Sequence, residues 1–463
     1  MQKIYIKNFA AIPEAEIEIK KILVLIGPQA SGKSTIATLI YLFRGLGNNI
    51  LRQILRDKEI VKNDDFSSII ITRFKELFGK QDINSAFEIT YYYYLKKDEN
   101  DKNINRYLTI RKLEGDPNLQ VLFDTTFFDQ PFQHNYRKLR NSIVHNPDTE
   151  SARLSKFNDQ YIDNYSFDFY EFRDHLKRIF FDNFNSIRFI IAGRSASVGF
   201  GSLFESFFRT QLEVKMIENR ININAQEILM SEYLESISYL KNRFETFSNF
   251  ENLTNQSYDR FLHYALIKFN SIFKDKYQIN NSGEYLELST GKLVPFFNAS
   301  SGQQESIRIL QDIFDVMAFK ETVFRVIEEP EAHLFPEAQK NLVELFALLS
   351  NHQPDNQIII TTHSPYILTV FNNLLFADRV VAKNNDVKSE VNEIIKEEYH
   401  LKYSDFSAYS LGNSFGDDGQ YYKDICDDDS GLINQNYLDT VSEILGIEFQ
   451  QLYKIHAKSF VRK

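Results

Sequence analysis

Residues 22–34 read ILVLIGPQASGKS, and this stretch decides the fold. Its first five residues form an unbroken run of β-branched residues and leucines, which predicts a strand buried on both faces. Gly27 ends the run, and from Lys33 to about Gly45 the apolar residues recur at helical intervals. The segment therefore predicts a buried strand, a glycine-containing loop and a helix in direct succession.

The loop fits the pattern G-x-x-x-x-G-K-[ST] from Gly27 to Ser34. Glycines let the backbone curl so that successive N–H groups point at phosphate oxygens, and the helix N-terminus adds its positive dipole end. We expect Lys33 to reach the β- and γ-phosphates of a nucleotide, and Ser34 to supply a hydroxyl to Mg²⁺. The residues expected to bind the nucleotide are Gly27, Gln29, Ala30, Ser31, Gly32, Lys33, Ser34 and Thr35.

Two more apolar runs end in residues that suit phosphate chemistry. Val323–Ile327 leads into Glu328 and Glu329. A carboxylate at a strand tip beside a phosphate loop can hold Mg²⁺ through water, and the next carboxylate can polarise a hydrolytic water. The run Ile358–Thr362 ends at His363, which we expect at the site shared by the strand tips, as a sensor of the γ-phosphate. Strands that alternate with helices predict a largely parallel α/β sheet.

A cluster of small residues, Ser300, Ser301 and Gly302, precedes a helix predicted from about Gln303 to Phe319. Small residues and glycine expose backbone N–H groups and hydroxyls to an anion. The same cluster is also a common helix cap, and Ser364 before a proline has that explanation too. On the residues alone, both interpretations of the cluster stay open.

Together, in this order, these four segments resemble the ABC-type ATPases of the RecF, SMC and OLD-like clade, over about residues 1–50 and 285–375. The resemblance implies ATP and Mg²⁺ as cofactors, and an ATPase lobe. It also implies that ATP is sandwiched between the phosphate loop of one copy and a signature segment of another. By position, the signature residues are Ser300, Ser301, Gly302 and Gln303.

The resemblance also implies a role for each strand-tip residue. Glu328 takes the position of the Mg²⁺-side acid, where Asp is more usual, and Glu329 that of the catalytic base. His363 takes the position of the switch histidine, and Lys33 acts on the phosphates. The glutamine of the Q-loop stays unassigned among four candidates, Gln81, Gln120, Gln130 and Gln133.

Within this clade the chain looks most like the ATPase subunits of bacterial anti-phage systems such as Septu and PARIS. The likeness implies a homodimer or higher homo-oligomer whose ATP cycle gates a separate effector nuclease of the Toprim or HNH type. OLD-type nucleases carry a Toprim domain after the switch histidine, whereas no apolar strand that ends in the required acids follows His363. We interpret Asp427–Asp429 as a solvated turn. The alternative function is a RecF-type clamp that holds DNA during repair.

Two basic segments leave further alternatives open. The stretch from Leu139 to His145 resembles the R-x4-H motif of HEPN ribonucleases, which implies that Arg140 and His145 act on an RNA backbone. Residues five apart on one helix lie about 140° apart around its axis, so such a site needs a partner surface. The competing interpretation is a surface helix that contacts a nucleic acid or a partner through Arg137, Lys138 and Arg140. Arg194 resembles a strand-end arginine of these ATPases, and it either binds nucleotide or stabilises the lobe.

We predict four parts along the chain. Residues 1–125 form the N-terminal part of the ATPase lobe, with the phosphate loop and a β subdomain, and residues 126–284 form a mainly helical insertion. Residues 285–385 form the C-terminal part of the lobe, and residues 386–463 a small mixed C-terminal extension. Separation of the phosphate loop from the signature makes dimerisation part of the expected mechanism.

Composition limits the possible settings of this chain. Its 53 basic and 63 acidic residues give a net charge of −10, which excludes a protein that is basic all over but not a local basic groove. The single cysteine, Cys426, excludes an intrachain disulfide and suits a reducing compartment. The longest apolar run, Ile36–Phe43, is shorter than the roughly 18 residues of a membrane span. We therefore expect a soluble cytoplasmic protein with no membrane contact.

Overall fold

The structure is a computed structural model of the chain. It describes residues 2–56, 66–79, 85–97, 103–124, 130–145, 167–180, 184, 186–199, 210, 225–245, 250–255, 259–280, 283–412, 420–434 and 446–455. Within this described part of the chain, no helix combines the length and apolarity that crossing a membrane requires.

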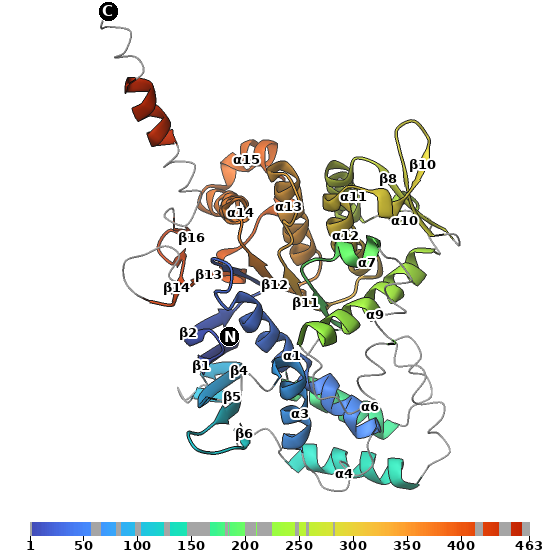
Figure 1. The fold of residues 1–463 in the computed structure, drawn as a ribbon, viewed down its shortest axis with the longest axis vertical. Coiled ribbons are helices and arrows are strands. Elements are labelled where there is room, and N and C mark those ends of the chain that lie inside the picture. Colours follow the sequence, from blue (N-terminus) through green and yellow to red (C-terminus); the bar gives the residue numbers. More distant parts are fainter. Residues whose placement is uncertain are drawn as a thin grey trace, which may run out of the picture.

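A six-stranded sheet runs through the centre of the molecule (Figure 1). Its strands, in spatial order, are β14 (Tyr422–Asp424), β13 (Phe406–Leu411), β3 (Ile22–Ile26), β12 (Gln357–Thr362), β11 (Val323–Glu328) and β7 (Ser186–Ile190). The five strands from β13 to β7 are parallel, and β14 is antiparallel at one edge. Every residue of β3, β12 and β13 is buried, as continuous runs in a covered parallel sheet should be. The predicted α/β fold class is confirmed.

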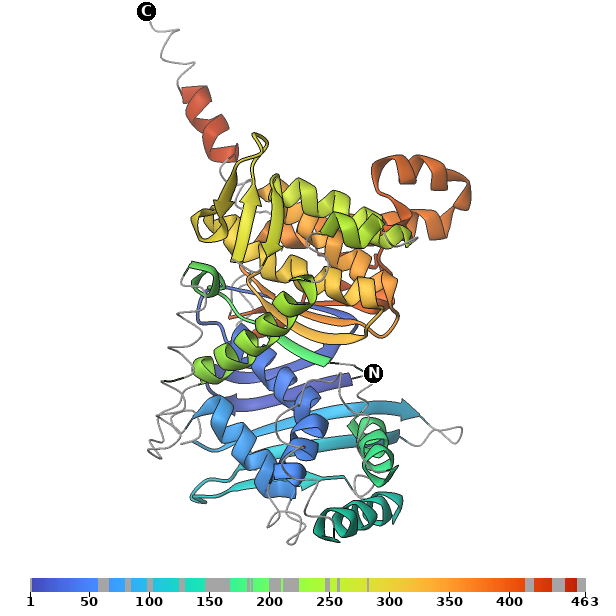
Figure 2. The same cartoon turned by 90° about the vertical axis from the view of Figure 1, so that its right-hand side faces the viewer.

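Helices cover both faces of this sheet, and Figure 2 shows them on its two sides. Helix α1 (Lys33–Arg56) packs on β11, β12 and β7. On the other side, α13 (Pro336–His352) packs on β12 and lies between α12 (Ser301–Phe319) and α14 (Pro365–Lys383). Helix α1 continues well past Gly45, where the sequence predicted its end. A Cβ atom at Gly47 would lie 3.2 Å from the ring of Phe180, so this glycine lets α6 (Phe167–Phe180) approach closely.

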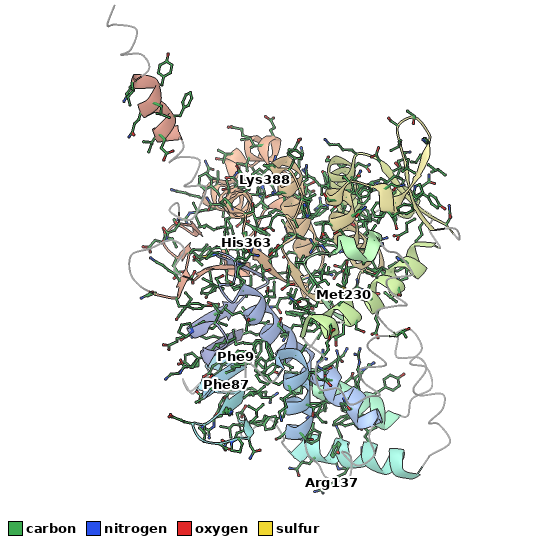
Figure 3. All side chains as sticks on the ribbon, viewed as in Figure 1. Phe9, Phe87, Arg137, Met230, His363 and Lys388 are labelled. Carbon is green, nitrogen blue, oxygen red and sulfur yellow. The ribbon has the colours of Figure 1, made fainter. Side chains whose placement is uncertain are left out.

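A second sheet, of five antiparallel strands, lies beside the first. Its order is β2 (Ile12–Ile19), β1 (Gln2–Phe9), β4 (Phe87–Lys97), β5 (Asn103–Lys112) and β6 (Leu119–Phe123). Helix α3 (Phe66–Phe78) packs on it through aromatic side chains, and the ring of Phe9 lies 5.6 Å from Phe74 and 5.0 Å from Phe87 (Figure 3). The helices α4 (Gln130–His145) and α6 pack together at the far end.

Four further helices in the described part of the chain pack on α12. The helices are α7 (Ser195–Gly199), α9 (Ala225–Glu245), α10 (Phe250–Asn255) and α11 (Arg260–Phe273). A three-stranded sheet joins β10 (Leu293–Pro295), β9 (Gly283–Glu287) and β8 (Lys276–Asn280). The short elements are η2 (Phe296–Asn298), η3 (Asn385–Val387), α15 (Lys388–Ile394), η4 (Glu397–Tyr399), η5 (Tyr403–Asp405), β15 (Cys426–Asp427), β16 (Leu432–Ile433) and a helix at 446–455.

The central sheet differs from the predicted division of the chain at two places. Strand β13 lies within the segment expected to be a C-terminal extension, yet it pairs in parallel with β3, with Phe406 opposite Ile22. Strand β7 lies within the expected insertion, yet it forms the edge beside β11. Pairing partners so distant in sequence leave no local pattern, and for this reason the predicted insertion and the predicted extension each contain strands of the central sheet.

Candidate functional site

The phosphate loop connects the end of β3 to the start of α1. The Nζ atom of Lys33 donates to the carbonyl oxygens of Gly27 at 2.8 Å and of Pro28 at 2.7 Å. This side chain is buried against its own loop. To bind a phosphate, the ammonium group has to exchange these two carbonyl oxygens for phosphate oxygens.

Charged groups from two other segments act on Lys33. Burial lowers the pKa of Lys33, and the carboxylates of Glu329 and Glu331 oppose that shift. The turn that follows β11 therefore lies near the phosphate loop, as the sequence predicted from strand tips that share one sheet edge. The structure brings the predicted lysine and the predicted base together.

Glu329 and His363 face each other at this edge. The Nε2 atom of His363 lies 3.3 Å from Oε1 of Glu329. The N–H of Glu329 donates to the carbonyl of Thr361 on the neighbouring strand at 2.9 Å. Glu329 has a φ of 43°, in the left-handed region, which costs a non-glycine residue about 1–3 kcal/mol. Such strain fits a carboxylate that its surroundings hold in one orientation.

Glu331 belongs to the same cluster, although the sequence reasoning missed it. Its Oε1 atom accepts hydrogen bonds from the hydroxyl of Thr362 at 2.6 Å and from the N–H of His363 at 2.8 Å. Its Oε2 atom is buried without a hydrogen-bond partner among the described residues. Glu331 thus joins the end of β12 and His363, which we call the histidine loop, to the turn that carries Glu329. The signal was present as a third acid directly after Glu328, Glu329 and a proline.

Arg194 lies at the end of β7 and is completely buried. Its guanidinium donates to four backbone carbonyl oxygens, those of Ile191 at 2.7 Å, Glu305 at 3.0 Å, Glu328 at 2.6 Å and Glu329 at 3.0 Å. The N–H of Arg194 also donates to the carboxylate of Glu305 on α12 at 3.1 Å. These bonds support the lobe-stabilising interpretation of Arg194. They connect the end of β11 to the first turns of α12.

The predicted signature residues form the N-terminus of α12. Ser300 is the N-cap, and its side chain accepts from the N–H of Gln303 while Gln303 Oε1 accepts from the N–H of Ser300. The Nε2 atom of Gln303 donates to the carbonyl of Phe273 at 2.9 Å and to Asp275 at 3.1 Å. The capping interpretation is therefore correct for Ser300 and Gln303, whereas the side chain of Ser301 is exposed.

Position 302 requires glycine because a neighbouring segment lies too close for a side chain, and not because of the backbone angles of Gly302. A Cβ atom at this position would lie 2.7 Å from the carbonyl oxygen of His333. The turn after Glu329 thus packs directly on the start of α12. From here on, Gly27–Ser34 with Glu328, Glu329 and His363 are the phosphate half of the site, and Ser300–Gln303 are the signature half.

The phosphate half fits ATP and Mg²⁺ in its donor groups. The N–H groups of Gly32, Lys33 and Ser34 make no hydrogen bond to the described part of the protein, and such first-turn N–H groups bind anions. The hydroxyl-bearing side chain of Ser34 is exposed. Glu328 uses its Oε2 atom to accept from the N–H of Ala192 at 3.2 Å. Its other oxygen suits Mg²⁺, which takes one or two carboxylates and keeps several waters.

Other predicted positions lie away from these groups. Arg140 and His145 both belong to α4, five residues apart on one helix, and their side chains lie outside the described residues. Lys138 pairs with Glu171 of α6 at 3.3 Å, and Arg137 lies at the lower end of the molecule, well away from His363 near its middle (Figure 3). The ribonuclease interpretation stays a prediction.

The Q-loop glutamine stays unassigned. Gln81 and the side chain of Gln130 lie outside the described residues, and Gln133 is exposed on α4. Gln120 lies on β6, where its amide bonds to Arg111 and Asp116.

The structure also describes three C-terminal residues that the sequence singled out. The carboxylate of Asp427 accepts from the N–H groups of Asp429 and Ser430, as expected of a turn. Burial raises the pKa of Cys426 to about 12, so its thiol stays protonated. Ser364 occupies the N-cap of α14, but its hydroxyl donates to Gln339 instead of capping the helix.

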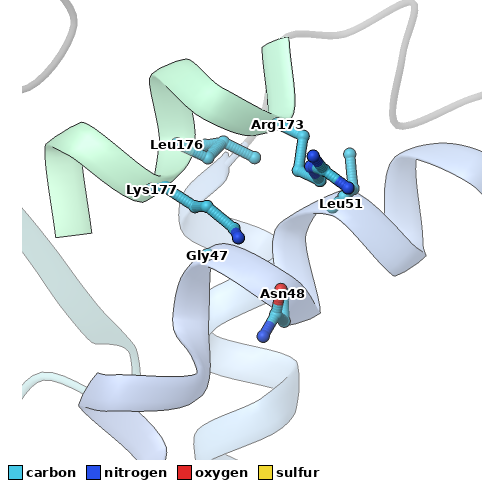
Figure 4. A pocket seen from close by; sticks show the side chains of 6 residues that line it. All are labelled: Gly47, Asn48, Leu51, Arg173, Leu176 and Lys177. Atoms are coloured by element: carbon cyan, nitrogen blue, oxygen red, sulfur yellow. The ribbon is translucent and has the colours of Figure 1, made fainter. Parts of the chain in front are cut away.

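A small hollow between α1 and α6 is no competitor for the nucleotide (Figure 4). Its lining residues are Gly47, Asn48, Leu51, Arg173, Leu176 and Lys177. Gly47 lies about 21 Å along α1 from Lys33 at 1.5 Å per residue. The hollow lacks room even for a water molecule.

A phosphate loop after the central parallel strand, with a carboxylate and a histidine at neighbouring strand ends, defines a P-loop nucleotide hydrolase. The chain belongs to the AAA ATPase domain family, whose model matches residues 1–368. The protein is therefore an ATPase. A comparison with curated proteins gives no match.

Solved structures that match this chain include SMC head domains. One, from Thermotoga maritima, is 9% identical with a TM-score of 0.34, and the match covers 80% of this chain and 90% of that chain. A second, an Smc head domain with an extended coiled coil bound to the C-terminal domain of ScpA and derived from Pyrococcus furiosus, is 15% identical with a TM-score of 0.33, and the match covers 80% and 92%.

Proposed function

We propose that two copies of this chain close head to tail on two molecules of ATP with Mg²⁺, and that hydrolysis reopens them. The supporting observation is the separation of the two halves of the site. Lys33, Glu329 and His363 converge at one sheet edge, whereas no hydrogen bond among the described residues joins Ser300–Gln303 to the phosphate loop. In this proposal, the exposed Ser301 contacts the ATP of a second copy.

Each residue of the phosphate half then has a distinct task. Lys33 neutralises the β- and γ-phosphates, and Ser34 and Glu328 hold Mg²⁺, which stabilises charge on the phosphates. Glu329 accepts a proton from the attacking water, a contribution of about 10²–10⁴ in rate. His363, 3.3 Å from Glu329, orients that carboxylate and contacts the γ-phosphate. Glu331 keeps the histidine loop in place.

We further propose that this cycle gates a separate effector nuclease of the Toprim or HNH type, in the cytoplasm, during bacterial anti-phage defence. Contacts to the γ-phosphate that exist only in the closed dimer give ATP its preference for that state. Hydrolysis removes those contacts and releases the dimer. The support for the defence setting is the resemblance of the ordered motifs to such ATPase subunits.

The dimer is tested with Glu329→Gln, which keeps the size of the side chain and removes the base. We expect this variant to bind ATP, to lose hydrolysis by about 10²–10⁴, and to elute as a dimer in ATP by light scattering. Lys33→Ala should stay monomeric because it cannot bind ATP. Ser301→Arg should bind ATP but stay monomeric. A Glu329→Gln protein that remains monomeric while saturated with ATP contradicts the proposal.

The effector is tested by affinity purification of Glu329→Gln from native cells, with Lys33→Ala as the control. A nuclease that co-purifies with the first variant and not with the second supports gating. Salt-sensitive binding of duplex DNA that strengthens with ATP, without a nuclease, would instead support a clamp on DNA.

A further inference from the structure

A segment almost 400 residues later in the sequence contacts the phosphate loop. The hydroxyl of Tyr421 donates a hydrogen bond to the carbonyl oxygen of Ser31 at 2.5 Å. The N–H of Gly412, just after β13, donates to the carbonyl of Tyr421 at 2.7 Å. The first bond connects the phosphate loop to the segment between β13 and β14, and the second joins Gly412 and Tyr421 within that segment.

The two segments also fit closely at their glycines. A Cβ atom at Gly32 would lie 2.5 Å from the hydroxyl oxygen of Tyr421, and one at Gly412 would lie 2.7 Å from the Cβ of Ser31. A Cβ atom at Gly27 would lie 2.4 Å from the carbonyl of Leu411. Gly412 also has a φ of 79°, which only glycine adopts without strain. The phosphate loop and this segment therefore pack too closely to accommodate a side chain at any of the three glycines.

The bond to Ser31 has a consequence on the opposite side of the same peptide. A peptide group is planar and trans, so the carbonyl of Ser31 and the N–H of Gly32 point in opposite directions. Because the carbonyl of Ser31 points toward Tyr421, the N–H of Gly32 points away from Tyr421. That N–H makes no hydrogen bond within the described part of the protein. It is therefore available to a phosphate oxygen.

We propose that Tyr421 is a positioning residue for ATP binding, whose hydroxyl holds the Ser31–Gly32 peptide with its N–H toward the phosphates. This inference rests on the proposed role of the phosphate loop. Burial raises the pKa of Tyr421 to about 12, so the phenol remains a hydrogen-bond donor throughout the neutral range. Tyr421 does not itself contact the reacting atoms.

The test is Tyr421→Phe, which removes one hydroxyl, with Tyr422→Phe as the matched control on the same segment. We expect Tyr421→Phe to raise the Kd for MgATP about five- to tenfold in calorimetry, as the loss of one hydrogen bond should. KM should rise by the same factor while kcat stays within twofold, because the catalytic groups are untouched. Inorganic tripolyphosphate, used as a competitor, should lose the same factor. Tyr422→Phe should bind like the wild type.

Gly412→Ala is a second variant that keeps the test decisive if Tyr421→Phe folds poorly. Its added methyl pushes on Ser31 from the same segment, and it should also raise the Kd for MgATP. Unchanged Kd values in both variants, with Lys33→Ala defective, overturn the positioning role alone. Unchanged binding in Lys33→Ala as well overturns the proposed role of the phosphate loop. A fall in kcat at constant KM would indicate a role in catalysis rather than in positioning.

Discussion

The two halves of the site are held in place in different ways. In the phosphate half, each functional residue follows a strand of one parallel sheet, and neighbouring strands bring Lys33, Glu329 and His363 together. In the signature half, a capping box, Gly302 and the partly buried Gln303 position one helix end. The first arrangement depends on strand order, and the second on side-chain contacts with loops.

The halves are nevertheless connected within one chain. Arg194 bonds to the carbonyls of Glu328 and Glu329 on one side and to Glu305 of α12 on the other. The turn at His333 packs on Gly302. In the proposed dimer, these contacts would join the ATP bound by a subunit to the ATP that it covers in its partner.

The largest expected effect comes from breaking that connection with Arg194→Ala. The variant removes the ion-pair partner of the buried Glu305 carboxylate and leaves several backbone carbonyls without their donor, so the free energy of unfolding should fall by about 3–5 kcal/mol. Urea unfolding measures this loss. Arg260→Ala is the control, because Arg260 is 71% exposed and its pair with Glu398 should contribute less than about 0.5 kcal/mol. A loss below about 1 kcal/mol in Arg194→Ala would mean that other contacts join the halves.

A smaller effect is expected in acid, which should destabilise the surroundings of the signature half before those of the phosphate half. Burial opposes the charged form of Glu284, but the guanidinium of Arg308 on α12 outweighs it and lowers the pKa of Glu284 to about 2. Because this folded-state pKa is below the unfolded value near 4.5, the pair stabilises fully above about pH 4.5. That contribution, about 3 kcal/mol, is lost as the pH falls toward 2.

Hydrogen exchange between pH 5 and pH 2.5 checks this prediction segment by segment. Protection should decline in α12 and β9 before it declines in β3 and α1. Glu284→Gln should be less stable at pH 7 and should lose little more in acid. Simultaneous loss of protection in both halves would contradict the separate anchoring of the signature half.

The smallest expected effect concerns Ala30, the non-glycine residue of the phosphate loop with a φ of 61°. Ala30→Gly relieves about 1 kcal/mol of left-handed strain but adds a similar entropy to the unfolded chain. The free energy of unfolding should therefore change by less than about 0.5 kcal/mol, and the Kd for ATP by less than twofold. Gly32→Ala, whose Cβ would meet Tyr421, should by contrast abolish binding. Tenfold weaker binding in Ala30→Gly would show that the methyl group itself shapes the loop.

The phosphate half was the more predictable from sequence. Strands β3, β11 and β12 are continuous apolar runs that end abruptly in polar residues, and parallel strands of one sheet carry such ends to one edge. Lys33, Glu329 and His363 could therefore be placed together without coordinates. For the signature half, the small residues left capping and anion binding equally open, and the structure shows the capping contacts.

The features that the sequence did not reveal depend on distant partners. Strand β13, with the sequence FSAYSL, has two serines among its six residues instead of a continuous apolar run, so its burial beside β3 has no local signature. Tyr421 stands in a polar segment, and nothing near it indicates a contact with Ser31. Arg194 was recognised as a strand-end arginine, but only the fold shows which carbonyls it holds. The end of α1 was misjudged because Gly45 and Gly47 normally disfavour a helix interior.

The position of β3 has a consequence for synthesis of the protein. Both of its neighbours, β12 and β13, come from the last quarter of the chain. As the nascent polypeptide leaves the ribosome, the GPQASGKS loop therefore emerges long before the two strands that flank β3. Prematurely terminated products that stop before residue 406 would carry the nucleotide motif without a completed sheet to support it. We therefore expect such fragments to be unable to compete with subunits that contain β12 and β13.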